Sequence, residues 1–282
     1  MLDMLKQARS ALAMLNPQEV LARAQTPVRI GLVAADPSGY AELEDFLGRP
    51  PGGSNVFRAS DPVIPDDVEV VLCAPGIKAP RGAFGLRADA PNCTIGEILR
   101  EREEFELALA RQFPVFRKKV VDGIVHAVAK ENALFAVTTS LPDVLPSLIE
   151  LPWAVGEWAS DTAFITVNQV RMAFQIAAAS GREVGFPHQK AEIISIVAGA
   201  FGWRALAREL VGKIPFGGGL IPKGAVAYAG TFAVGKGLEV LYNSGRRLTR
   251  GQFRELRHDA LDRGQQVAGK LLDSDRRSET TA

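Results

Sequence analysis

The sequence predicts an α/β remnant, with short parallel-type strands and helices, followed by a mainly α-helical domain. Two buried-strand patterns, "VRIGLVA" at 28–34 and "VEVVLCA" at 68–74, fall in the first part of the chain. From residue 115 the sequence becomes alanine-rich and apolar, punctuated by glycine and proline, which is typical of packed helices. The expected segments are an N-terminal amphipathic helix at 1–25, an α/β segment at 26–114, a helical domain at 115–262, and the end of the last helix with a polar tail at 263–282.

The first 25 residues predict an amphipathic helix, broken or capped at Asn16-Pro17. Its apolar positions recur at helical spacing: Leu2, Leu5, Ala8, Leu12 and Leu15. Lys6 and Arg9 interrupt them, so no apolar core of a secretory signal forms, and we expect a cytoplasmic protein. Two alternatives stay open for the stripe: it lies in a bilayer interface as a peripheral contact, or it packs on the helical domain.

The rest of the α/β segment contains two predicted helices. One occupies 40–48 and ends before a proline- and glycine-rich loop. The other occupies 94–113, with Thr94 as N-cap and Glu97 three residues later, the spacing of a capping box.

The helical domain is divided by glycine and proline. A helix that begins at Ser160 or Asp161 and ends before Gly181 has the clearest boundaries. The other expected elements are a long helix at 115–141, a helix or helix pair at 186–214, a glycine-rich turn at 215–224, a helix at 225–245, a closing helix at 249–272 and a disordered polar tail at 273–282.

Composition excludes several functions. The 33 basic and 32 acidic residues give a net charge of +1, whereas a general nucleic-acid binder needs a basic surface. The basic clusters at 116–119 and 246–258 are interpreted as solvated helix faces rather than phosphate or lipid contacts. The uncharged runs at 193–203 and 224–235 are shorter than the ~20 residues of a membrane span, which favours buried core helices.

No metal or cofactor site is expected. The two cysteines, Cys73 and Cys93, are too few for a thiolate metal site or a disulfide scaffold. The three histidines, His126, His188 and His258, lie far apart in the sequence and have no neighbour at ligand spacing.

The stretch "IGLVAADPSGYAELEDFLG" at 30–48 places a tight loop between a strand and a helix, where nucleotide-binding proteins hold phosphate. In the pattern G-x-x-x-x-G-K-[ST], glycines admit the phosphates, lysine reaches them and the hydroxyl holds Mg²⁺. That frame here contains Ala34, Gly39, Tyr40 and Ala41, so the lysine and the hydroxyl are both missing. Asp36 adds a negative charge where a triphosphate would lie.

The second half resembles a known family. The matching residues are Gln169, Met172, Ile176, Ile214, Pro215, Gly219, Ala227, Tyr228, Thr231 and Gly235. Over residues 115 to 245 the chain resembles the GTPase-associated domain of unknown function, which accompanies Era-like GTPases and occurs in bacterial inner-membrane proteins. The resemblance implies association with GTPases and with membranes, and it carries over no biochemical activity.

The first half in turn resembles a degenerate Era-like GTPase. The stretch 70–76 resembles the "DTPG" strand end of these domains, with Cys73 and Ala74 in place of the Asp-Thr pair. No N-K-x-D or T-K-x-D motif for reading guanine occurs in the chain. We therefore expect the loop to be empty and without catalytic residues. Its residues are Ala34, Ser38, Gly39, Tyr40 and Ala41.

These features predict a non-enzymatic, pseudo-GTPase-like adaptor that binds a protein partner, such as a GTPase, or a membrane surface. One alternative is an atypical nucleotide-binding protein that holds an anion through backbone N–H groups behind Ser38-Gly39. A second alternative is an integral inner-membrane protein of the same family. Gly217-Gly218-Gly219 is interpreted as a helix-to-helix turn, and Tyr228 and Thr231 as buried hydrogen-bonding groups.

Overall fold

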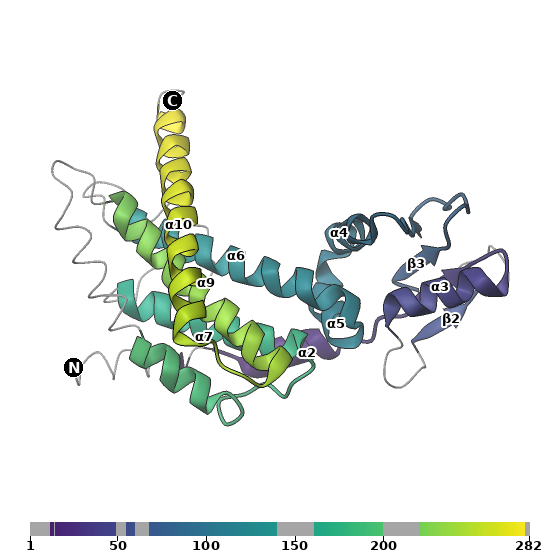
Figure 1. Cartoon of the computed structure of the whole chain (residues 1–282), viewed down its shortest axis with the longest axis horizontal. Helices are drawn as coiled ribbons and strands as arrows, with labels where there is room; N and C mark the ends of the chain where they lie inside the picture. The colour runs from purple at the N-terminus through teal and green to yellow at the C-terminus, as the bar shows by residue number, and fades with distance from the viewer. Residues whose placement is uncertain are drawn as a thin grey trace. The chain divides into compact units, whose positions relative to one another are not determined.

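The computed structural model describes residues 12–13, 15–48, 55–59, 68–139, 161–199 and 220–279 (Figure 1). The chain divides into two compact units. Residues 18–122 and 177–184 form the first, called the α/β unit, and the described residues outside these ranges form the second, called the helical unit. A small parallel sheet with helices and a predominantly helical remainder confirm the predicted fold class.

The α/β unit contains a four-stranded parallel sheet in the order β2-β1-β3-β4. Its strands are β1 (Ile30–Val33), β2 (Val56–Arg58), β3 (Val70–Cys73) and β4 (Phe84–Gly85). Ile30 is in register with Val56 on one side and with Val70 on the other. This order opens the doubly wound sequence 2-1-3-4-5, in which the connections leave β1 and β3 toward opposite edges of the sheet.

Hydrophobic burial explains why the central strands were predictable and the edge strands were not. Ile30, Leu32 and Leu72 are fully buried, as expected for strands that are covered on both faces. By contrast, β2 and β4 have only three and two residues, too few to show a sequence period, and neither was predicted.

Helices α2 (Pro17–Gln25), α3 (Pro37–Leu47), α4 (Pro91–Glu101) and α5 (Glu106–Gln112), with the 3₁₀ turn η1 (Glu103–Phe105), complete this part of the chain. The single helix predicted at 94–113 is therefore wrong, because α4 begins at Pro91 and the chain turns at Arg102. Proline is favoured in the first helical turn because it has no N–H to leave unsatisfied.

Thr94 is not the predicted N-cap. It is fully buried inside α4, where its hydroxyl donates to the carbonyl oxygen of Gly85 and accepts from the N–H of Arg87, both at 3.1 Å. The threonine thus ties the helix to the end of β4. Glu97 forms no capping box, and its carboxylate lies 3.9 Å from Arg87.

The long helices are α6 (Pro114–Thr138), α7 (Asp161–Ala179), α9 (Leu220–Ser244) and α10 (Arg250–Glu279), with a further helical stretch at 190–199. Helix α9 begins four residues before the predicted end of the glycine-rich turn. Helix α10 continues through most of the expected tail at 273–282, since that stretch contains neither glycine nor proline to stop it. Of the apolar positions predicted near the N-terminus, Leu2, Leu5 and Ala8 lie outside the described residues, while Leu12 and Leu15 are half-buried.

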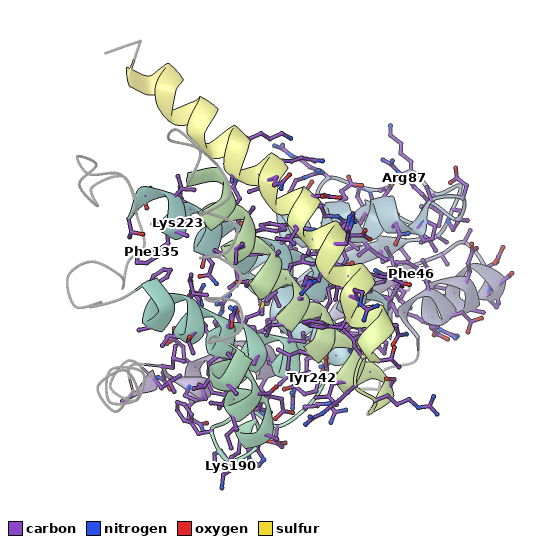
Figure 2. All side chains as sticks on the ribbon, turned by 60° about the vertical axis from the view of Figure 1, so that its left-hand side comes forward. Phe46, Arg87, Phe135, Lys190, Lys223 and Tyr242 are labelled. Carbon is purple, nitrogen blue, oxygen red and sulfur yellow. The ribbon has the colours of Figure 1, made fainter. Side chains whose placement is uncertain are left out.

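Helices α9 and α10 form a close pair in the helical unit, and both views show α10 lying across α9 (Figures 1 and 2). The side of α10 that meets α9 carries Ala260, Gly264 and Ala268, all of them buried. A Cβ at Gly224 of α9 would lie 3.0 Å from the Cβ of Ala268. Small residues are therefore required here because the two helix backbones approach each other closely.

Polar side chains bridge α6, α7 and α9 inside the helical unit. Asn132 donates to the hydroxyl of Thr231 at 2.8 Å, and Asn168 donates to the side-chain oxygen of Asn132 at 2.8 Å. Gln169 also donates to the Thr231 hydroxyl, at 3.2 Å. These polar groups are buried, and a buried polar group without a partner costs free energy. Each of the three hydrogen bonds therefore contributes to holding the helices in place. These residues therefore restrict the register of the three helices.

Among the described helices, none is both long enough and apolar enough to cross a membrane.

Candidate functional site

The loop after β1 is the site to which the sequence points. It lies where the connections from β1 and β3 diverge, and ligands of doubly wound sheets bind at this carboxyl edge. Residues 34–36 lead from β1 into α3, and Ala74 follows β3 directly. The geometry of these few residues decides whether an anion can be held.

Asp36 caps the first turn of α3. Its backbone is extended, with φ −148° and ψ 169°, and its carboxylate accepts the N–H of Gly39 at 2.8 Å. Pro37 follows in the first helical position and has no N–H to offer. A phosphate-binding loop needs free N–H groups at this helix end, and here a carboxylate of the chain itself engages one of them.

Gly39 packs tightly against the ends of the two central strands. A Cβ at this position would lie 3.0 Å from the Cβ of Ala34 and 3.1 Å from the Cβ of Ala74. The glycine is therefore explained by the close approach of the chain to β3. No phosphate is needed to account for it.

Tyr40 replaces the lysine of the phosphate-binding pattern and is directed toward β2. Its hydroxyl donates to the carbonyl oxygen of Ala59 at 2.8 Å, and the guanidinium of Arg58 lies 5.3 Å from its ring centre. Arg58 in turn donates to both carboxylate oxygens of Glu44, at 2.9 and 3.1 Å. The Glu44 carboxylate raises the pKa of Arg58. The ring is thus held by α3 and β2 rather than reaching over the loop.

The end of β3, residues 73–76, carries no carboxylate or hydroxyl side chain that could position Mg²⁺. Cys73 is fully buried, burial raises the pKa of its thiol, and Ala74 is also buried. Gly76 has φ +83°, so its backbone lies in the left-handed region that favours glycine. Ser38 and Ala41, the remaining residues of the predicted loop, are both exposed.

The two segments that carry the family resemblance meet in the helical unit. Gln169 contacts Thr231 through the hydrogen bond described above, and a Cβ at Gly235 would lie 3.2 Å from the sulfur of Met172. The Gly235 Cβ would also lie 2.5 Å from a methyl carbon of Val125 on α6. Three of the matching residues lie outside the described ranges: Ile214, Pro215 and Gly219.

Tyr228 and Thr231 are both buried on α9, where Thr231 makes hydrogen bonds and Tyr228 makes a ring contact. The Thr231 hydroxyl donates to the carbonyl oxygen of Ala227 at 2.9 Å and accepts from Asn132 and Gln169. The Tyr228 ring is stacked on Phe232, with the ring centres 6.0 Å apart. Burial raises the pKa of Tyr228, and this shift is opposed by Arg263.

Asn132 and Asn168 were missed as notable residues. Asn132 follows two charged residues in "KENALF" and Asn168 precedes a glutamine in "TVNQV", so neither is a lone polar residue in an apolar stretch, and only helical spacing could have placed them on the core side. The side-chain oxygen of Asn168 is buried and accepts no hydrogen bond from another described residue.

No cluster of three or more potential metal ligands occurs within the described ranges. His126, His188 and His258 are all exposed. His258 has two carboxylates near its Nδ1, Asp259 at 4.0 Å and Asp262 at 3.5 Å. Gly217-Gly218-Gly219 lies outside the described residues.

Comparison of the chain with protein-family models, with curated proteins and with solved structures finds no match in any of the three.

Proposed function

We propose that this chain is a non-enzymatic interaction protein. It joins a GTPase-like α/β unit that has lost its phosphate chemistry to a helical unit of the GTPase-associated type. It acts by binding, either to a protein partner such as a GTPase or to a membrane surface. One observation carries the proposal: the Asp36 carboxylate accepts the Gly39 N–H at the helix end where a nucleotide phosphate would have to lie.

Two effects disfavour nucleotide binding at this loop. The first is electrostatic, because the Asp36 carboxylate would repel a phosphate. The second is that the loop has no lysine at the position where the phosphate-binding pattern has one. Phosphoryl transfer depends on such a lysine and on Mg²⁺ placed at the phosphates. Tyr40 supplies no positive charge, and its hydroxyl already donates to Ala59.

Calorimetry with Mg²⁺-GTP and Mg²⁺-ATP tests the proposal directly. We expect no heat of binding for the full chain, with an active Era-like GTPase as the positive control. The double variant Tyr40→Lys/Ala41→Ser should also fail to hydrolyse nucleotide, because Cys73 and Ala74 still stand where Mg²⁺ would be positioned. Micromolar affinity of the unaltered chain for either nucleotide would overturn the proposal in favour of a nucleotide-binding protein.

The binding role itself is tested by affinity capture from extract of the native cell, with and without detergent. We expect a GTPase to be enriched over a control capture with the variant Gly235→Leu, which disrupts the junction of α6, α7 and α9. Equal enrichment on both would contradict a specific partner site in the helical unit.

A further inference from the structure

The parallel sheet of the α/β unit has two edges, formed by β2 and β4. At the β2 edge, Asn55 accepts a hydrogen bond from β1 at 2.7 Å and Ala59 donates one to β1 at 2.8 Å. Successive residues of a strand alternate the side to which they direct their N–H and C=O groups. Asn55, Phe57 and Ala59 therefore face β1, and Val56 and Arg58 direct their main-chain groups away from the sheet.

At the β4 edge, a side chain of the protein itself engages the corresponding outward groups. Leu86 donates its N–H to the carbonyl oxygen of Cys73 on β3 at 2.9 Å, so the C=O of Gly85 and the N–H of Arg87 point outward. The hydroxyl of Thr94 donates to the first and accepts from the second, both at 3.1 Å. Thr94 thus takes the place of a further strand and closes this edge.

The β2 edge has no such closure within the described ranges. No hydrogen bond joins the outward N–H and C=O groups of Val56 and Arg58 to another described residue. Unpaired main-chain groups along a sheet edge are a template for pairing with another chain. Val56 and Phe57 are only half-buried, so an added segment would also cover apolar area. Because β2 has three residues, the segment that pairs with it is short.

Side-chain contacts hold β2 in place before any partner arrives. Arg58 donates to both carboxylate oxygens of Glu44 on α3, and the guanidinium of Arg29 lies 5.2 Å from the ring centre of Phe57. Since side chains alternate along a strand, Val56 and Arg58 share the face covered by α3, and Phe57 lies on the opposite face. An edge that is already ordered loses less conformational entropy on binding.

The α3 face beside β2 carries negative charge. Helix α3 contains Glu42, Glu44 and Asp45 and has no lysine or arginine. Glu44 is engaged by Arg58, whereas Glu42 and Asp45 are exposed. Asp45 follows Glu44 by about 100° around the helix, on the side away from the buried residues. A segment added to β2 would therefore meet carboxylates on this face, which favours basic side chains there.

We propose that the β2 edge binds an extended segment of a protein partner as an added strand. The segment presents basic side chains to the α3 face and apolar side chains to the face of Phe57. The inference rests on the proposed binding role and names its surface and partner class. A protein segment is favoured over a membrane because the open groups are main-chain donors and acceptors, and because the carboxylates of α3 repel anionic lipid.

Amide hydrogen exchange of the full chain, resolved by residue, tests whether the edge is open. The amides of Val56 and Arg58 should exchange quickly, whereas those of Phe57, Ala59 and Arg87 should be protected, because each of these three donates a hydrogen bond. Protection of Val56 and Arg58 in the dilute chain would show that the chain itself covers the edge. Protection that appears only at high protein concentration would assign the edge to a second copy. Either result would overturn the inference.

The probe for strand addition is a peptide of about eight residues in which lysine and valine alternate, so that one face is basic and the other apolar. It should protect the amides of Val56 and Arg58, and its binding should weaken as salt is raised. A peptide with glutamate in place of lysine should bind less tightly. A peptide with proline in place of valine keeps the charge but cannot form a ladder, so it should not bind. Equal binding of the lysine–proline peptide, or no protection by the lysine–valine peptide, would overturn strand addition.

A main-chain variant tests the pairing from the protein side. Val56→Pro removes one outward N–H and leaves the hydrogen bonds to β1 in place, a change that edge strands tolerate. It should weaken binding of the lysine–valine peptide about two- to tenfold, the effect of losing one hydrogen bond. The control is Val56→Thr, which keeps the N–H and the branched side chain and should bind as the unaltered chain does. Equal binding by the proline variant would contradict pairing at this residue.

A charge variant tests the same surface without altering the strand. Glu42→Gln/Asp45→Asn should weaken binding of the lysine–valine peptide about two- to fivefold for each carboxylate. The matched control is Asp89→Asn/Glu101→Gln, which removes two exposed carboxylates between β4 and the end of α4 and should leave binding unchanged. Equal loss in both double variants would reduce the effect to net charge and overturn the charged face of the site.

The outcome for the β2 edge is separable from the proposed function. Nucleotide calorimetry reports on the loop after β1 and does not depend on strand addition. If neither nucleotide nor the lysine–valine peptide binds, only the strand-addition site is overturned. Nucleotide binding at the loop would remove the proposed function whatever the peptide does.

Discussion

Gly264 of α10 lies against the backbone of Ala225 of α9. A Cβ added to Gly264 would lie 2.6 Å from the carbonyl oxygen of Ala225 and 2.9 Å from its Cα. Both atoms belong to the main chain, so neither can move aside as a flexible side chain would. The distance between the two helices therefore depends on the absence of a side chain at this position.

The variant Gly264→Ala should lower the free energy of unfolding by about 1–3 kcal/mol, the usual cost of forcing a methyl group into a filled contact. This loss outweighs the gain of about 1 kcal/mol that alanine brings to a helix. Urea unfolding followed by circular dichroism measures it. The control is Gly269→Ala on the same helix, where a Cβ would meet nothing within 4 Å, and it should stabilise the protein. Stabilisation by both substitutions would contradict the close contact.

The hydrogen bond between Asn132 and Thr231 joins residues 99 positions apart in the sequence. The variants Asn132→Ala and Thr231→Val should each cost about 1–3 kcal/mol, because each leaves buried polar partners unsatisfied. The double variant should cost less than the sum, by about 1 kcal/mol, since the second change removes a partner that is already unpaired. Denaturant unfolding of all four proteins gives this coupling. Combining Asn132→Ala with Thr94→Val, which share no hydrogen-bond partner, should be additive.

Glu106, at the start of α5, is expected to make stability fall as pH rises. Burial raises the pKa of its carboxyl, with Arg23 opposing and Glu103 adding to the shift. Below about pH 4 the group is protonated in both the folded and the unfolded chain and has no effect. As pH rises, the unfolded chain releases the proton first, so the carboxyl destabilises the fold, fully so above its folded pKa.

The variant Glu106→Gln should therefore raise the unfolding midpoint at pH 7, and the gain should disappear toward pH 4. Thermal unfolding across this pH range measures it. The control is Glu104→Gln, at an exposed position two residues earlier, which should change the midpoint little. A gain that stays constant with pH would show that packing, and not ionisation, is responsible.

The two cysteines should differ in reactivity. Cys73 is fully buried in β3 and burial raises the pKa of its thiol, whereas Cys93 is exposed in the first turn of α4. A disulfide reagent needs an accessible thiolate. Cys93 should therefore react quickly in the folded chain, whereas Cys73 should react only after denaturation. The variant Cys93→Ser should lose the fast phase, and Cys73→Ser should keep it. Fast reaction of both thiols in the folded chain would contradict the burial of β3.

The sequence by itself was sufficient for features that depend on neighbours along the chain. The apolar runs that contain Ile30 and Leu72 predicted the two central strands, and the helical periodicity predicted the long helices. The departure from the phosphate-binding pattern was likewise readable, because Tyr40 and Ala41 stand where that pattern has a lysine and a hydroxyl. Each of these inferences needs only a residue's type and its position in a short pattern.

Tertiary structure decided the features that depend on contacts between distant segments. Thr94 has the sequence signature of a helix cap but is drawn inside α4 by its bonds to the end of β4. The capping carboxylate of Asp36 and the contact of Gly39 with Ala74 show how the loop is filled, which residue types alone do not. The physical reason is that a hydrogen bond or a close contact depends on a distance, and distances between segments exist only once the chain has folded.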